Sequence, residues 1–245
     1  MHMKTKTFDN LNDLNKDFTS WLKELLSEKE TLSIALSGGS TPKSLFNYWS
    51  KNHVDDIDWK KIKFFWGDER CVWPNDDDSN YKMAKDHLFD NVPVLSENIF
   101  RIRGENDAYK EARSYEELLR NELEETNELG VPQFDILMLG MGDDGHTASI
   151  FPHEMNLWDS SNLCVVATHP QSRQMRVSLS GRTINAAKHV AFLVTGAAKA
   201  KKVQAVIENK EEAKDKYPAA KVAPTTGSLT WYLDSYAGKL LKENK

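Results

Sequence analysis

The sequence predicts an α/β fold in which a mostly parallel sheet is covered by helices on both faces. Short apolar runs alternate with amphipathic segments along most of the chain, and strands that alternate with helices typically build a parallel sheet. Several of these runs end in turns rich in glycine and polar residues, where such sheets bind ligands. We find no internal repeat, low-complexity segment or linker, so we expect a single domain over residues 1–245.

The first half of the chain begins as helix, strand and helix. Residues 11–26 carry apolar side chains at helical spacing, and residues 31–36 alternate as a strand does. Thr41 and Pro42 open the next helix, because threonine caps helices and proline is favoured in their first turn. Residues 62–66 form a further apolar strand, which ends at a glycine. Two more helices are expected over residues 80–89 and 108–129, and the second is long and acidic.

The second half adds strands and shorter helices. Residues 134–139 form a strand, and the apolar run at 136–139 is typical of a strand buried on both faces. Two β-rich segments, 163–168 and 175–179, precede a helical stretch over 183–187. The remaining expected elements are a strand over 190–194, a helix over 197–208, a charged connection over 209–216 and a terminal helix over 230–241.

Composition indicates a globular protein and excludes several functional classes. Of the 245 residues, 40% are hydrophobic and 28% charged, which suits a packed core under a polar surface. The net charge of −5 argues against a nucleic-acid partner, which would require a basic face. No apolar run approaches the roughly 18 residues of a membrane span, and the N-terminus has no signal-peptide pattern. Cys71 and Cys164 lack metal-type spacing and are typical of a reduced, cytoplasmic protein.

The most informative segment follows the strand expected over 134–139. A glycine-rich turn, 140–145, leads directly to His146, which comes two residues after Asp144. Catalytic groups collect at the carboxyl ends of parallel strands, so His146 is a candidate general base. Asp144 would fix its tautomer and stabilise the imidazolium. A lone histidine is more often structural than catalytic, but its position beside Asp144 favours the catalytic interpretation.

A second turn, between the strand at 31–36 and the next helix, suits an anion. It contains Gly38, Gly39, Ser40 and Thr41, and both hydroxyls and amides at a helix N-terminus can bind phosphate. The segment matches neither the P-loop nor the Gly-x-Gly-x-x-Gly pattern, so it implies no nucleotide cofactor. The alternative is an ordinary strand-to-helix turn.

Charged residues follow the strand at 62–66. Asp68, Glu69 and Arg70 would face the same crevice, where Arg70 could hold a phosphate or stabilise an oxyanion. A salt bridge between Arg70 and one of the two acids is the alternative. The acidic run at 76–78 is interpreted as a solvated loop rather than a metal site.

Three further basic residues are candidates for contact with an anion. Arg173 and Arg176 lie around the β-rich segment at 175–179. Lys199 falls in the first turn of the helix expected over 197–208, where the helix dipole disfavours a cation. That position suggests a bound anion, and a solvated surface lysine is the alternative.

Together these segments resemble the 6-phosphogluconolactonase family of the glucosamine-6-phosphate deaminase-like superfamily. The similarity covers roughly residues 30–235. Its motifs are the phosphate loop at 37–42, the Gly-Asp-Glu-Arg segment at 67–70, the signature at 139–152 and the closing pattern at 224–231. The resemblance implies a Rossmann-like three-layer domain that hydrolyses 6-phospho-D-glucono-1,5-lactone to 6-phospho-D-gluconate. It implies no metal, no nucleotide cofactor and no obligate protein partner.

The resemblance also implies roles for individual residues. His146 is the general base and Asp144 its orienting partner. Ser40, Thr41 and Arg70 would hold the 6-phosphate or the lactone oxygens. Arg176 and Lys199 are further candidates for this contact.

The chain departs from the family pattern at Gln171, where relatives often carry a lysine. That contact is either absent or supplied by Arg173. The role of Asp68 is open, because the matching aspartate is catalytic in the deaminases but a lactone hydrolase does not need it.

Two alternative functions share parts of this sequence pattern. A glucosamine-6-phosphate deaminase shares the phosphate loop but typically carries Asp-Glu-Tyr where this chain has Asp68, Glu69 and Arg70. A non-catalytic sugar-phosphate sensor usually adds a DNA-binding module, and residues 1–30 offer one helix without a basic recognition helix. Both comparisons favour the lactonase.

Overall fold

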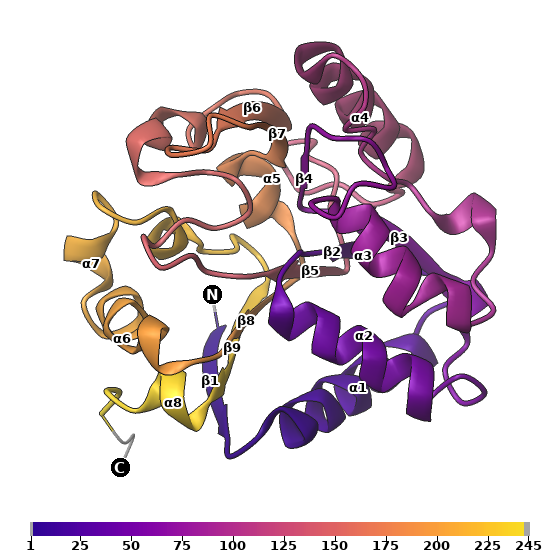
Figure 1. The fold of residues 1–245 in the computed structure, drawn as a ribbon, viewed down its shortest axis with the longest axis horizontal. Coiled ribbons are helices and arrows are strands. Elements are labelled where there is room, and N and C mark those ends of the chain that lie inside the picture. The colour runs from indigo at the N-terminus through magenta and orange to yellow at the C-terminus, as the bar shows by residue number, and fades with distance from the viewer. Residues whose placement is uncertain (1, 243–245) are drawn as a thin grey trace.

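Six parallel strands form the central sheet of the computed structural model, which describes residues 2–242 (Figure 1). The strand order is β1-β9-β8-β5-β2-β3. Every residue of β2 and β5 is buried, as expected of strands covered on both faces. The strands are β1 (His2–Phe8), β2 (Leu32–Leu36), β3 (Ile62–Trp66), β5 (Ile136–Leu139), β8 (His189–Val194) and β9 (Ser228–Asp234).

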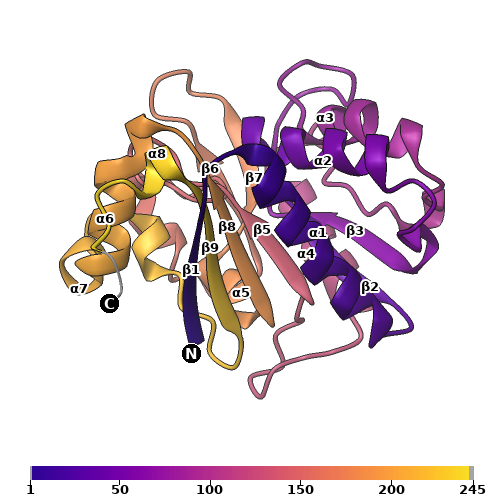
Figure 2. The same cartoon turned by 90° about the horizontal axis from the view of Figure 1, so that it is seen from below.

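Helices lie on both sides of this sheet (Figures 1 and 2). On one side α1 packs against β1 and β9, and on the other side α8 contacts the same two strands. The α-helices are α1 (Leu11–Ser27), α2 (Ser40–Asn52), α3 (Asn80–His87), α4 (Ala108–Glu122), α5 (Gly181–Ala186), α6 (Ala200–Glu208), α7 (Lys210–Ala213) and α8 (Ser235–Gly238). Short 3₁₀ helices cover Trp59–Lys61, Phe89–Asn91, Ser96–Asn98, Pro152–Leu157, Ala197–Lys199 and Pro218–Lys221. Within residues 2–242, no helix is long and apolar enough to cross a membrane.

A small antiparallel sheet stands at the carboxyl ends of the central strands. Its order is β4-β7-β6, formed by Asp68–Arg70, Met175–Leu179 and Cys164–Thr168. Gly67 joins the two sheets, because its amide donates to the Leu36 carbonyl and its own carbonyl accepts from the Leu179 amide, both at 2.9 Å. This junction carries β4 and β7 over the end of β2.

The predicted fold class is confirmed. The strands expected at 31–36, 62–66, 134–139 and 190–194 are β2, β3, β5 and β8 of the central sheet. The two β-rich segments are β6 and β7 of the small sheet. In α1, the predicted apolar stripe is buried: Leu14, Phe18 and Leu22 have no exposed surface.

The terminal helix predicted over 230–241 is wrong. Ser228–Asp234 is strand β9, which lies between β8 and β1, and helix α8 covers just Ser235–Gly238. Trp231 stacks on Phe192 of β8 with ring centroids 3.9 Å apart. Pairing on both edges and aromatic packing stabilise a strand here, and these tertiary contacts outweigh the local helical spacing.

Other elements also differ from the prediction. The polar strand β1 was not expected, because its residues do not alternate in the way a buried strand does; its pairing with β9 makes it a strand. Helix α4 ends at Glu122 rather than 129, and the Asn127 side chain accepts from the amides of Leu129 and Val131 in a turn beyond it. The charged connection at 209–216 contains the short helix α7.

Candidate active site

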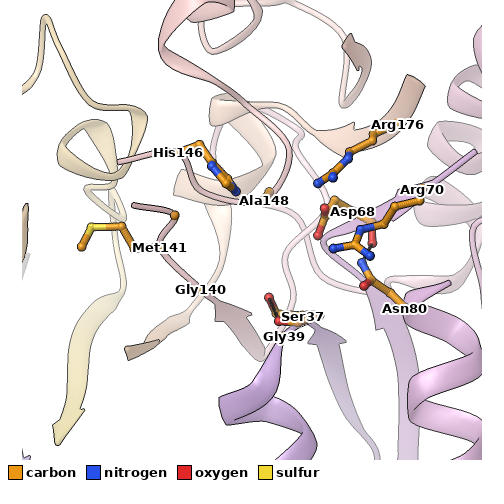
Figure 3. Close-up of a pocket in the computed structure, with 12 residues that line it drawn as sticks. Ser37, Gly39, Asp68, Arg70, Asn80, Gly140, Met141, His146, Ala148 and Arg176 are labelled. Atoms are coloured by element: carbon orange, nitrogen blue, oxygen red, sulfur yellow. Dashed lines mark hydrogen bonds between the residues drawn. The ribbon is translucent and has the colours of Figure 1, made fainter. Parts of the chain in front are cut away.

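A pocket of about 190 Å³, open at its mouth, lies where β2, β3 and β5 end (Figure 3). Three strand ends and the small sheet contribute to its wall. The lining residues are Ser37, Gly38, Gly39, Asp68, Arg70, Asn80, Gly140, Met141, Gly142, His146, Ala148 and Arg176. The structure therefore brings together five of the predicted site residues with His146: Gly38, Gly39, Asp68, Arg70 and Arg176.

The turn after β5 holds His146 in a defined orientation. Its Nδ1 lies 2.7 Å from Oδ1 of Asp144, and its backbone amide donates to the same oxygen at 3.0 Å. A carboxylate can only accept, so Nδ1 carries the proton and Nε2 is left free to take another. Figure 3 shows the imidazole pointing into the pocket. This arrangement is the one that a general base needs.

The pKa of Asp144 is lowered to about 2 by this arrangement. Partial burial acts in the opposite direction and raises the pKa, but the hydrogen bond and charge of His146, together with backbone amides, outweigh it. Asp144 is therefore a carboxylate throughout the pH range of any enzymatic assay.

Replacing Asp144 by asparagine is expected to remove a stabilisation that depends on pH. The folded-state pKa lies below the ordinary 3.8, so the carboxylate stabilises the fold above about pH 4 and this effect disappears as the pH falls towards 2. The difference in Tm between the two proteins should therefore be larger at pH 5 than at pH 3. The side chain is 42% exposed, so the difference should be small. Circular dichroism melts measure this difference, and Asp55→Asn, at an exposed position, is the control. A difference independent of pH would contradict the prediction.

Gly142 leaves the space that the imidazole occupies. A Cβ built there would lie 2.2 Å from Nδ1 of His146 and 2.7 Å from Oδ1 of Asp144. Among residues of the turn, Gly145 has a positive φ of 88°, and its added Cβ would meet the ring of Tyr217 at 2.6 Å. The glycines of this turn therefore allow close packing around His146 as well as backbone conformations that other residues rarely adopt.

Gly142→Ala is expected to lower kcat by about 100-fold, because displacement of a catalytic group by about 1 Å has this scale of effect. The folded protein should persist, since the alanine methyl group displaces side chains at the pocket rather than the core. Steady-state kinetics and a thermal melt test this. Gly238→Ala, on helix α8 away from the pocket, is the control. Unchanged kcat in Gly142→Ala would show that the imidazole position is not critical.

Two arginines lie side by side on the wall opposite His146. Arg70 of β4 and Arg176 of β7 are directly paired across the antiparallel strands, so their side chains share one face. Burial and the nearby Arg70 charge lower the pKa of Arg176. Within the described residues, the buried Nε atoms of both arginines have no hydrogen-bond partner. Two like charges with unused donors provide a site for an anion.

The predicted alternative, a salt bridge of Arg70 with Asp68 or Glu69, is wrong for the part of the chain described. Arg70 donates from Nη1 to the Asp78 carbonyl at 2.6 Å. Glu69 is buried and accepts from the hydroxyl of Ser79 and from the amides of Asn80 and Tyr81, at 2.8–3.0 Å. Burial raises the pKa of Glu69, and these backbone hydrogen bonds oppose that rise. Glu69 thus holds the start of α3 rather than contacting a ligand.

Asn80 is a pocket residue that the sequence analysis missed. Its side-chain amide donates to the Asp68 carbonyl at 2.9 Å. Its Oδ1 lies against Gly38, where an added Cβ would approach to 2.0 Å, so residue 38 must be glycine. The signal in the sequence was Ser79, which caps α3 through its side chain and places the following residue at the helix start.

A buried serine behind the pocket was also missed as a site residue. Ser149 has no exposed surface and donates from Oγ to Oδ2 of Asp68 at 2.5 Å. Ala148 precedes it with a φ of +47°, a left-handed conformation rare for a residue other than glycine. This kink turns the chain after His146 back towards β4. The hydrogen bond fixes one oxygen of Asp68 and leaves the other for the pocket.

Five predicted site residues do not line the pocket, and one of them, Asp144, contacts His146 from behind it. Ser40 is exposed at the start of α2, and the Thr41 hydroxyl pairs with that of Thr195 at 2.8 Å. Lys199 lies 2.6 Å from Asp143, which supplies the anion that its position suggested. Arg173 is exposed in the turn between β6 and β7, with a φ of 59°. In the loop between β2 and α2, contacts with a ligand would instead come from Ser37, Gly38 and Gly39.

The fold and the pocket define an α/β protein with a ligand site at the carboxyl ends of its parallel strands, where a histidine–aspartate pair faces two arginines. Within residues 2–242 there is no group of three or more His, Cys, Asp or Glu side chains arranged to hold a metal ion. The chain belongs to the family described as glucosamine-6-phosphate isomerases/6-phosphogluconolactonase, whose model matches residues 7–231.

Individual relatives are similar over most of their length. A 6-phosphogluconolactonase of Haemophilus influenzae is 46% identical over 85% of this chain and 87% of that protein. A 6-phosphogluconolactonase of Treponema pallidum is 43% identical over 79% of this chain and 80% of that protein. The solved structure of 6-phosphogluconolactonase from Trypanosoma brucei superposes with a TM-score of 0.85 at 29% identity and covers 98% of both chains.

Proposed function

We propose that this chain, as one domain over residues 1–245, hydrolyses 6-phospho-D-glucono-1,5-lactone to 6-phospho-D-gluconate in the oxidative pentose phosphate pathway. The observation that carries the proposal is the His146–Asp144 pair facing Arg70 and Arg176 across one pocket. A base on one wall and unused cationic donors on the other suit an anionic substrate with an electrophilic carbonyl.

The chemistry needs one base and no covalent intermediate. Nε2 of His146 takes a proton from water, and the water oxygen bonds to C1 of the lactone. The C1 carbonyl becomes an oxyanion, which then collapses and breaks the bond between C1 and the ring oxygen. The imidazolium returns its proton to that oxygen, so the base is restored. Asp144 keeps Nδ1 protonated and stabilises the imidazolium.

The two arginines receive different roles in this proposal. Arg176 and His146 contact the same aromatic ring, so Arg176 stands nearer the base and stabilises the carbonyl oxygen. Arg70 lies beside the start of α3, where Asn80 touches Gly38. We therefore assign the 6-phosphate to Arg70 and to the backbone of Gly38 and Gly39, at the N-terminus of α2.

A coupled assay tests the function. Glucose 6-phosphate and its dehydrogenase generate the lactone, and 6-phosphogluconate dehydrogenase reports the product, with and without this protein. Product formation faster than spontaneous hydrolysis is expected. Failure of the folded protein to accelerate it would contradict the proposal, and ammonia release from glucosamine 6-phosphate would then indicate the deaminase instead.

We also propose a cytoplasmic location, with no nucleic-acid, membrane or obligate protein partner. Cys71 and Cys164 are free thiols, as is usual in a reducing compartment. Burial raises the pKa of Cys71 to about 11, so it stays a thiol at neutral pH. The net charge of −5 fits a protein that reads neither nucleic acid nor an anionic membrane surface.

A further inference from the structure

Phe151 is a fully buried aromatic residue with unusual neighbours. Its ring has no exposed surface, yet it is absent from the main hydrophobic cluster formed by the buried residues described. Instead its ring lies within 4.6–5.8 Å of the imidazoles of His146, His153 and His169, measured between centroids. The Arg176 guanidinium carbon lies 5.5 Å from its centroid. A phenylalanine surrounded by four basic groups is not explained by core packing alone.

The contact with His146 supplies a restraint that the carboxylate does not. Asp144 holds Nδ1 through a hydrogen bond of 2.7 Å. The Phe151 ring lies beside the imidazole, at 4.6 Å between centroids and 51° between planes. The hydrogen bond limits where Nδ1 lies, and the ring limits how the imidazole tilts about that bond. Together they determine the direction of Nε2.

The contact with Arg176 acts on a side chain that few hydrogen bonds orient. Its buried Nε has no hydrogen-bond partner among the described residues. Its Nη1 approaches Oγ of Ser149 at 3.5 Å, which is long for a hydrogen bond. The negative face of an aromatic ring attracts a guanidinium at such a separation, so Phe151 provides the orientation that hydrogen bonds do not.

We propose that Phe151 is a positioning residue, which holds the imidazole of His146 and the guanidinium of Arg176 against one ring so that both act on the same carbonyl. The inference rests on the proposed function and extends it to a residue without any group that reacts. The negative quadrupole of the ring also favours the imidazolium that forms when His146 takes a proton. Figure 3 shows the two basic side chains pointing into the pocket from opposite sides.

Fluorination of the ring separates this role from simple packing. Phenylalanine at 151 is replaced by its mono-, di- and trifluoro analogues, which keep the ring shape and progressively remove the negative charge of its face. We expect kcat for the lactone to fall stepwise, by about 10-fold over the series. The Kd of 6-phosphogluconate, measured by calorimetry, should change much less, because the phosphate contacts lie elsewhere.

Phe18 is the matched control. It is also fully buried and also packs against three rings, those of Trp21, Trp49 and Tyr232. The same fluorinated series at 18 should leave kcat unchanged. Phe151→Leu, which removes the ring, should lower kcat at least as much as trifluorination. If that variant does not fold, the fluorinated series decides the question.

The outcomes are distinguishable. Turnover by the unmodified protein that is insensitive to fluorination at 151 would overturn the positioning role and leave the proposed function intact. An equal response at 18 would overturn it as well, because it would show a general effect of core fluorination. Absence of turnover in the unmodified protein would contradict the proposed function itself.

Discussion

Replacing His146 by alanine is expected to lower kcat for lactone hydrolysis by about 100-fold or more, since a general base contributes about 10²–10⁴-fold. The variant should fold, because His146 lies on the pocket surface with 26% of its side chain exposed. KM should change little, because the histidine acts on water rather than on the phosphate. The coupled assay measures both constants once the spontaneous rate is subtracted.

The chain offers a matched control for this experiment. His53 pairs with Asp56 on the surface, with Nδ1 and Oδ1 2.9 Å apart, and neither residue lines the pocket. His53→Ala removes the same type of side chain from the same type of pair and should leave kcat unchanged. Retention of full activity by His146→Ala would exclude the histidine from the mechanism, whatever the control shows.

Replacing Arg70 by methionine is expected to raise KM for the phosphorylated lactone by about 10- to 100-fold, the scale of a lost hydrogen bond to a charged group. Methionine keeps much of the length of the side chain and removes the charge. Arg176→Met is the matched comparison, because the two residues oppose each other on β4 and β7. It should lower kcat more than it raises KM, since its guanidinium is assigned to the developing oxyanion.

An unphosphorylated substrate sharpens the comparison. Wild-type protein should prefer 6-phospho-D-glucono-1,5-lactone over D-glucono-1,5-lactone, and Arg70→Met should reduce that preference in kcat/KM. Arg176→Met should lower activity on both lactones and leave their ratio unchanged. A preference that survives Arg70→Met and disappears in Arg176→Met would reverse the two assignments.

Features that depend on residues close together in the sequence could be predicted. The apolar runs of β2, β3, β5 and β8 are buried because the residues themselves are hydrophobic, wherever the strand is placed. His146 and Asp144 are two residues apart, so a tight turn brings them into contact with little dependence on the rest of the fold. The fold class and the candidate base therefore followed from the sequence.

The errors in the predicted fold arose where pairing between strands that are distant in the sequence decides the structure. The segment 230–241 has apolar residues at helical spacing, but β9 forms because two strands flank it. The polar strand β1 similarly depends on β9. The partner strands are not near one another in the sequence, so no local sequence pattern predicts their pairing.

The site likewise combines features that neighbouring residues determine with features that depend on residues distant in the sequence. The sequence alone determined that glycine-rich turns with a histidine, an aspartate and arginines follow the strands, because these are properties of adjacent residues. The tertiary structure decided that Arg70 opposes Arg176, that Phe151 contacts both His146 and Arg176, and that Lys199 turns to Asp143. These contacts join residues from different elements. They depend on strand register and on the packing of the small sheet, which are set by the free energy of the whole fold rather than by any local segment.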